Sequence, residues 1–272
     1  MKLSVFYDHI LQAAEQTGRA IPDLLNEVSR AGIEAVEINM TYLREHEETL
    51  GLLHDAGLSV SCVYEFYGME ASAERMKALR HVKTAKKAGA GLILVVPGFL
   101  AEETADFAAC VPDYGKICDF LNGNKKALRM AKGLSRITSL AKRHGITTVI
   151  EDFDHESSPI SCTGGMRWFA ERIPGLRFTF DTGNFIVYGE DPFSAWELMQ
   201  DRVVHVHCKD RGQQAVAVGD GRLPMRELLG KIAASGYEGY YAIEHFDAVC
   251  QMDCIGRSAA FLRSIDKTEK IV

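Results

Sequence analysis

Four short stretches in the second half of the chain are apolar and rich in β-branched and aromatic residues, and each ends in an acidic residue or a histidine. The stretches cover residues 147–151, 178–181, 203–207 and 240–244, and they end at Glu151, Asp181, His207 and Glu244. Successive end residues are 30, 26 and 37 positions apart, which is room for one strand, one helix and the return to the next strand. Such a series indicates consecutive strands of a parallel sheet or barrel, whose carboxyl ends open onto one face.

Strand-like runs alternate with helical patterns about eight times along the chain. The first half contributes expected strands at residues 3–7, 35–38, 58–64 and 92–96, and later helices are expected near 127–144, 165–172, 192–200, 224–233 and 257–264. The stretch 99–124, with Pro112, Gly115 and Gly123, is less regular. It is either a long active-site loop with a short helix or a surface insertion. The alternation predicts an α/β fold, a single (β/α)8 TIM barrel.

The length of 272 residues fits one such barrel, which typically takes about 250 residues. No Pro/Ser-rich linker divides the sequence, and 47% hydrophobic with 25% charged residues is an ordinary globular composition. Residues 1–272 are therefore expected to form one domain.

Composition excludes several classes of partner. The net charge of −6 argues against nucleic acid, which favours basic surfaces, so a small molecule is the expected ligand. The seven cysteines are scattered without a CxxC pair, which predicts reduced thiols in a cytoplasmic protein rather than a disulfide framework or a zinc ribbon. No apolar run approaches the roughly 18 residues that span a bilayer, and the first ten residues lack the apolar core of an export signal. The sequence leaves a homo-oligomer open.

The four end residues form the principal candidate site. An acidic residue at a strand end often only caps the next helix, and a strand histidine often only bonds within the core. Three carboxylates and one imidazole on four successive strands, however, together suit a divalent ion such as Mn²⁺, Co²⁺, Mg²⁺ or Zn²⁺. One such ion is expected to bind Glu151, Asp181, His207 and Glu244.

These runs carry a resemblance to a known family. TVIE ending at Glu151, RFTFDTG around Asp181, VVHVHCKD around His207 and YYAIE ending at Glu244 resemble the xylose isomerase-like TIM barrel superfamily, in particular its sugar phosphate isomerase/epimerase group. That group includes ketose 3-epimerases, and its relatives include inosose and dehydroshikimate dehydratases and endonuclease IV. The resemblance implies that the four residues bind one divalent metal, and that Glu151 and Glu244 also exchange protons with the substrate.

The sequence departs from the family pattern at one position. The third residue after the Asp of strand six is commonly His in these families, whereas here it is Asn184, which can bind a hydroxyl but cannot act as a base. An endonuclease IV-like trinuclear zinc site needs further histidines on the early strands. His54 and His81 fall in helical patterns instead.

Several further residues are candidates for substrate contact. Lys209 follows His207 in the family-like His-x-Lys-Asp run, and Glu156 and Glu37 follow or end expected strands. The segment 219–222, GDGR, offers backbone amides and Arg222 to a substrate phosphate, or is simply a tight turn. His205, two positions before His207, points to the same side of its strand and either supports His207 or packs in the core.

The reaction expected from this site is isomerisation or epimerisation of a sugar or sugar phosphate. An α-hydroxy carbonyl would react through an enediolate, with Glu151 and Glu244 as paired acid and base groups. A lyase or dehydratase of the same superfamily and a non-catalytic metal- or sugar-binding barrel remain alternatives. Sequence does not distinguish these outcomes, the sugar, its phosphorylation or the metal.

Overall fold

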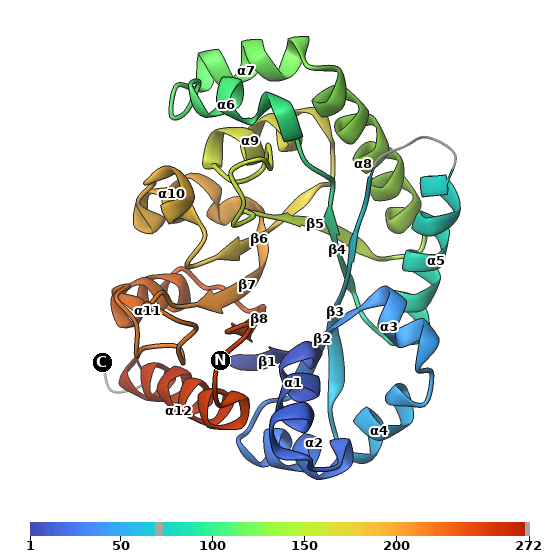
Figure 1. The fold of residues 1–272 in the computed structure, drawn as a ribbon, viewed down its shortest axis with the longest axis vertical. Helices are drawn as coiled ribbons and strands as arrows, with labels where there is room; N and C mark the ends of the chain where they lie inside the picture. Colours follow the sequence, from blue (N-terminus) through green and yellow to red (C-terminus); the bar gives the residue numbers. More distant parts are fainter. Residues whose placement is uncertain (69–72, 270–272) are drawn as a thin grey trace. The chain divides into compact units, whose positions relative to one another are not determined.

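The computed structural model describes residues 1–68 and 73–269 of the chain. Within this part, eight strands follow one another as neighbours in a closed barrel, in the order β1 to β8. Figure 1 traces them from β1 in blue to β8 in red. The strands are β1 (Lys2–Phe6), β2 (Ala35–Asn39), β3 (Ser59–Phe66), β4 (Leu92–Val96), β5 (Thr147–Glu151), β6 (Arg177–Asp181), β7 (Val203–Lys209) and β8 (Tyr240–Glu244). The predicted α/β barrel is confirmed.

Helices connect the strands along the described chain. They are α1 (Tyr7–Thr17), α2 (Ile21–Arg30), α3 (Met40–Glu45), α4 (Thr49–Asp55), α5 (Ala73–Lys87), α6 (Thr104–Ala108), α7 (Tyr114–Gly123), α8 (Lys125–Arg143), α9 (Thr163–Arg172), α10 (Pro192–Met199), α11 (Met225–Ala234) and α12 (Gln251–Glu269). Side-chain caps mark several beginnings: Asn124 accepts from the first amides of α8, and Asp191 accepts from Ser194 at α10. Short 3-10 turns lie at Ala101–Glu103, Phe185–Tyr188 and Gln200–Arg202.

The chain divides into two compact units, and the first comprises residues 1–62 and 204–272. Its strands pair in parallel in the order β7, β8, β1, β2. The register places Ser4 beside Ala35 and Ala242, and it places Lys209 beside Glu244. Helix α12 packs against α1 and α11, and it covers a core that includes Leu3, Leu24 and Leu229, all fully buried.

The second unit comprises residues 63–203. Strand β5 pairs in parallel with β4 on one side and β6 on the other. Its core contains two fully or almost fully buried tryptophans, Trp168 and Trp196, the latter meeting Phe180 edge-on at a ring distance of 5.3 Å. Helix α8 packs against α5 and β5, so the apolar face of this 19-residue helix is buried.

The segment 99–124 differs from its prediction, because much of it is helical. It holds the turn Ala101–Glu103, then α6 and α7, and α7 packs against α8 and α9. Asp113 caps α7, and Ile117 and Leu121 bury one side of it at helical spacing. Helix α12 is also longer than the expected 257–264, since it begins at Gln251.

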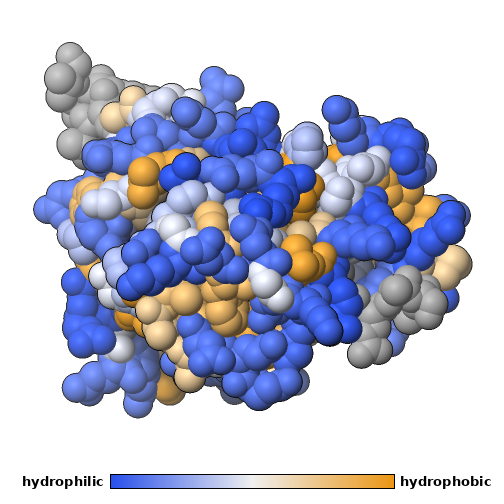
Figure 2. Space-filling view, turned by 90° about the horizontal axis from the view of Figure 1, so that it is seen from above, coloured by the Kyte–Doolittle hydropathy of each residue, from blue (hydrophilic) through white to orange (hydrophobic). Residues whose placement is uncertain are grey.

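Three further features concern the cysteines, the length of the helices and the character of the surface. No disulfide links the seven cysteines, all of which lie within the described residues. No helix of the described residues is long and apolar enough to span a bilayer. Figure 2 shows a face dominated by hydrophilic side chains with smaller hydrophobic patches between them, which is ordinary for a folded surface.

Candidate metal and catalytic site

In the first unit, β7 and β8 bring an imidazole and an ammonium group to one carboxylate. Alternation along β7 directs His205, His207 and Lys209 to the same side. His207 Nδ1 lies 3.2 Å from Glu244 Oε2, and Lys209 Nζ lies 2.8 Å from Glu244 Oε1. Both oxygens of Glu244, the last residue of β8, therefore have a nitrogen partner.

The charge on Glu244 follows from these contacts. Burial alone raises the pKa of its carboxyl, but the positive charge of Lys209 and the hydrogen bond and charge of His207 outweigh burial and hold the pKa well below its usual range. Glu244 is thus an ionised carboxylate at neutral pH, ready to bind a cation or to accept a proton.

A third strand of the same unit, β2, brings Glu37 into contact with both histidines. Glu37 Oε2 lies 2.8 Å from His205 Nε2 and 3.0 Å from His207 Nε2, and all three side chains are buried. Burial raises the pKa of Glu37, but His207 and His205 together lower it to about 2. Burial lowers the pKa of His205, with Glu37 opposing that effect. Contact of Glu37 with a substrate stays a prediction; its observed contacts favour a role in orienting His207.

In the second unit, β5 and β6 place two more carboxylates together. Glu151 and Asp181, the last residues of these strands, offer oxygens within 4.8 Å of each other, and both side chains are buried. Asp181 Oδ1 also accepts from the amide of Gly183 at 2.6 Å. Two like charges this close in a buried site favour a cation between them.

Asp152, which sequence reasoning missed, adds a third acid to this group. Its Oδ1 accepts from the amide of Asp181 at 2.8 Å, and the side chain is fully buried. Burial, followed by the charges of Asp181 and Glu151, raises the pKa of Asp152 well above its ordinary value. The signal in the sequence was only its position directly after Glu151.

The donor types test whether a divalent ion fits these residues. Glu151 with Asp181 in one unit, and His207 with Glu244 in the other, are buried carboxylates and an imidazole, the ligands that Mn²⁺, Co²⁺, Mg²⁺ and Zn²⁺ accept. Each pair on its own offers two donors, fewer than a tightly bound divalent ion takes.

The predicted substrate contacts lie in different settings. Asn184 is buried, and its Nδ2 donates to the carbonyl of Asp152 at 2.8 Å, which supports the β5 end rather than leaving the amide open. Glu156 is exposed, and its carbonyl accepts from Tyr188. Lys209 is partly buried against Glu244. Substrate binding by these residues stays a prediction.

The glycines of the segment 219–222 serve the fold. Asp210 is buried and accepts from the amides of Gly219 at 3.0 Å and Gly221 at 2.9 Å. These two amides are therefore occupied by an internal carboxylate, which favours the tight-turn alternative; phosphate binding by this segment with Arg222 stays a prediction. Arg222 is exposed, and its amide donates to the carbonyl of Arg211.

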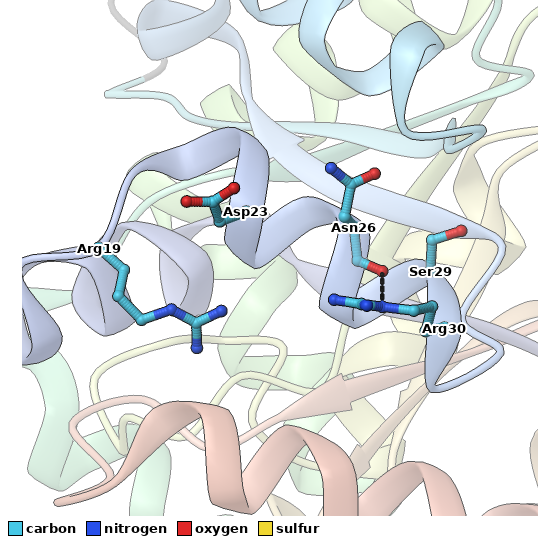
Figure 3. Close-up of a pocket in the computed structure, with 5 residues that line it drawn as sticks. All are labelled: Arg19, Asp23, Asn26, Ser29 and Arg30. Carbon is cyan, nitrogen blue, oxygen red and sulfur yellow. Dashed lines mark hydrogen bonds between the residues drawn. The ribbon is translucent and has the colours of Figure 1, made fainter.

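A surface hollow lies along α2, and its lining includes none of the predicted site residues. Arg19, Asp23, Asn26, Ser29 and Arg30 line it (Figure 3). Arg30 Nε donates to the carbonyl of Asn26 at 3.2 Å, and Arg19 pairs with Glu27 at 2.7 Å. Both arginines are thus engaged within the helix region itself, and the hollow carries no catalytic group.

Comparison with known proteins identifies one family of TIM barrels. The model of the family described as xylose isomerase-like TIM barrel matches residues 25–265. Inosose dehydratase of Lacticaseibacillus casei is 29% identical over 138 residues, covering 43% of this chain and 46% of that protein. Fructoselysine 3-epimerase of Escherichia coli O157:H7 is 27% identical over 122 residues, covering 43% and 44%. The matched segments thus span under half of each relative.

A solved structure extends the likeness to the whole chain. The structure of an L-ribulose 3-epimerase superposes with a TM-score of 0.73 at 14% identity, covering all of this chain and 98% of that one. At that identity the likeness concerns the fold.

Proposed function

Because the chain belongs to the xylose isomerase-like TIM barrel family, we propose that it is a divalent-metal-dependent isomerase of sugars or sugar phosphates, of the epimerase kind. One observation carries the proposal. Successive strands β5 to β8 end in or near a buried residue of metal-ligand type, namely Glu151, Asp181, His207 and Glu244. We assign the cation to these two pairs together.

The chain's own residues divide the work of such a reaction. A bound divalent ion would supply positive charge beside the substrate oxygens, where negative charge develops when a proton leaves the neighbouring carbon. Lys209 and His207 hold Glu244 ionised, the only form in which a carboxylate can accept that proton. Glu151, on the other pair of strands, is the second acid/base group. Return of a proton to the opposite face inverts the carbon, and return to the adjacent carbon exchanges aldose and ketose.

Dehydration is the second candidate function. The curated relatives that match include inosose dehydratases as well as an epimerase. Asn184 stands where these families commonly have His, and its amide cannot transfer a proton, so this position does not single out epimerisation. In a dehydration the same base removes the carbon proton, and the neighbouring hydroxyl leaves as water.

The two candidates separate in one experiment. The Mn²⁺-loaded protein is incubated in deuterium oxide with a panel of ketoses, ketose phosphates and inososes. Deuterium on the carbon next to the carbonyl of an inverted or isomerised sugar supports the proposal, whereas an absorbing unsaturated product supports dehydration. Binding without either product would contradict both and indicate a non-catalytic sugar-binding barrel.

Variants then test the two glutamates. Glu151→Gln and Glu244→Gln each keep the shape and one oxygen donor but lose the base, so turnover should fall by at least about 10²-fold. Glu15→Gln, an exposed change on α1, is the matched control and should keep wild-type turnover. Wild-type turnover in both site variants would refute the assignment of Glu151 and Glu244.

A further inference from the structure

A buried trio of Glu37, His205 and His207 lies within the first unit. Each side chain is at most 1% exposed, and one carboxylate oxygen, Glu37 Oε2, meets the Nε2 atoms of both histidines at 2.8 and 3.0 Å. We infer that Glu37 is a positioning residue that fixes the tautomer and the ring orientation of His207, so that Nδ1 is the nitrogen of His207 that can release a proton and offer a lone pair.

The argument rests on which atoms can donate. An ionised carboxylate only accepts hydrogen bonds, so the Nε2 atom of each imidazole must carry the proton that reaches Glu37. Whatever the charge of His207, its Nε2 is then protonated, and the nitrogen able to offer a lone pair is Nδ1. That atom lies 3.2 Å from Glu244 Oε2, at the end of the strand where the candidate ligands stand.

Ring packing reinforces the orientation. The Phe6 ring meets the His207 ring edge-on at 4.9 Å and 72°, and the His205 ring meets it at 5.2 Å and 83°. Phe6 on β1 pairs in register with Glu37 on β2. These two neighbouring strands therefore supply both the carboxylate and one of the rings that contact His207. His207 is thus held both by its Nε2 bond and by aromatic edges.

The trio is poorly explained by stability alone. Glu37 Oε1 and His205 Nδ1 are buried and have no hydrogen-bond partner within the described part of the chain. Buried polar atoms of this kind cost free energy, and an apolar cluster of the same shape would avoid the cost. Retaining three ionisable groups here makes physical sense if they serve Nδ1, the nitrogen of His207 that faces Glu244. Carboxylates that bond a metal-binding histidine commonly change metal affinity by about 10- to 100-fold when removed.

The first test reads the tautomer in the metal-free protein and does not depend on the proposed function. Long-range ¹H–¹⁵N spectra of the histidine rings, with the His207 signals assigned by their loss in His207→Gln, should show a protonated Nε2 and an unprotonated or secondarily protonated Nδ1. In Glu37→Gln the Nε2-protonated form of His207 should no longer dominate. A His207 that carries its only proton on Nδ1 in the wild type would overturn the inference, even if Glu37→Gln does not fold.

The second test uses metal affinity and rests on the proposed function. Glu37→Gln should weaken Mn²⁺ binding by about 10- to 100-fold, measured by titration calorimetry. Ser61→Ala is the matched control, because Ser61 donates a buried bond to the carbonyl of Val36 at 3.0 Å, next to Glu37, without contacting either ring. Its Mn²⁺ affinity and His207 tautomer should stay as in the wild type.

The outcomes separate the two claims. A wild type that binds no Mn²⁺ refutes the proposed function, while the ring spectra still decide the role of Glu37. Unchanged spectra in Glu37→Gln, or equal losses of affinity in Glu37→Gln and Ser61→Ala, refute the positioning role.

Discussion

Replacing Lys209 by Met should destabilise the metal-free protein by leaving the buried Glu244 carboxylate with one nitrogen partner instead of two. Lys209 Nζ contacts Glu244 Oε1 at 2.8 Å, and the two side chains are 15% and 6% exposed. Removing one partner of a buried ion pair costs about 3 to 5 kcal/mol. Because Lys209 retains some exposure and His207 still bonds the other oxygen, we expect the lower end, about 3 kcal/mol in the free energy of unfolding.

The lowered pKa of Glu244 determines how the cost of Lys209→Met changes with pH. In the wild type, burial raises the folded-state pKa of Glu244, but Lys209 and His207 outweigh burial and hold this pKa below its ordinary value. Its contribution is therefore present above the unfolded pKa, near 4.5, and is lost as pH falls through the folded value. Lys209→Met weakens this depression, so the loss relative to wild type should be largest above about pH 5 and should shrink toward pH 3.

Urea unfolding of the metal-free variants checks the pair. Glu244→Gln removes the charge that Lys209 compensates, so Lys209→Met should cost about 2 kcal/mol less in that background. Lys116→Met is the control, because Lys116 is 67% exposed and pairs with Asp113 at 3.9 Å, and it should cost under about 0.5 kcal/mol. Equal costs of Lys209→Met with and without the Glu244 charge would refute the reasoning.

Three further results are expected. Burial is the main cause that lowers the pKa of His81 to about 4, and the ring hydrogen-bonds to Tyr67 and to the carbonyl of Val63. The free energy of unfolding should therefore fall by about 2 kcal/mol between pH 7 and pH 5. In urea unfolding His81→Gln should flatten this pH dependence, and an equal slope in the variant and the wild type would contradict it. Asp210→Ala should speed proteolysis within 211–223, seen by mass spectrometry, because amides there lose their acceptor; unchanged cleavage would count against this. DNA with abasic sites should be neither bound in gel shifts nor nicked, and nicking that Asp181→Ala abolishes would overturn this.

Local sequence patterns were enough to predict the strands of the barrel. The strand at 147–151 and the strand at 240–244 have the predicted bounds, because a short run of β-branched and aromatic residues between polar turns is a local signal. In the segment 99–124 only one short helix was expected, whereas the structure has the two helices α6 and α7. Pro112, Gly115 and Gly123 are loop signals, and the short stripe of Ile117 and Leu121 gains its meaning only from the helices on which it packs.

The site was predictable only where residues act at strand ends. Glu37 and His207 are 170 positions apart, and the sequence near either residue does not indicate their hydrogen bond. Likewise, Asp210 accepts from the amides of Gly219 and Gly221, a contact that the sequence near these glycines does not indicate. Alternation along β7, in contrast, placed His205 beside His207 from the sequence alone.

Metal content tests the central claim most directly. The purified protein, stripped with a chelator, incubated with Mn²⁺, Co²⁺ and Zn²⁺ in turn and freed of unbound ions, should retain about one ion per chain. His207→Ala and Asp181→Ala, one from each pair, should each lose that ion, while Glu15→Gln should retain it. No retained metal in the wild type, or retention at the wild-type level in the His207 and Asp181 variants, would contradict the assignment of one ion to these residues.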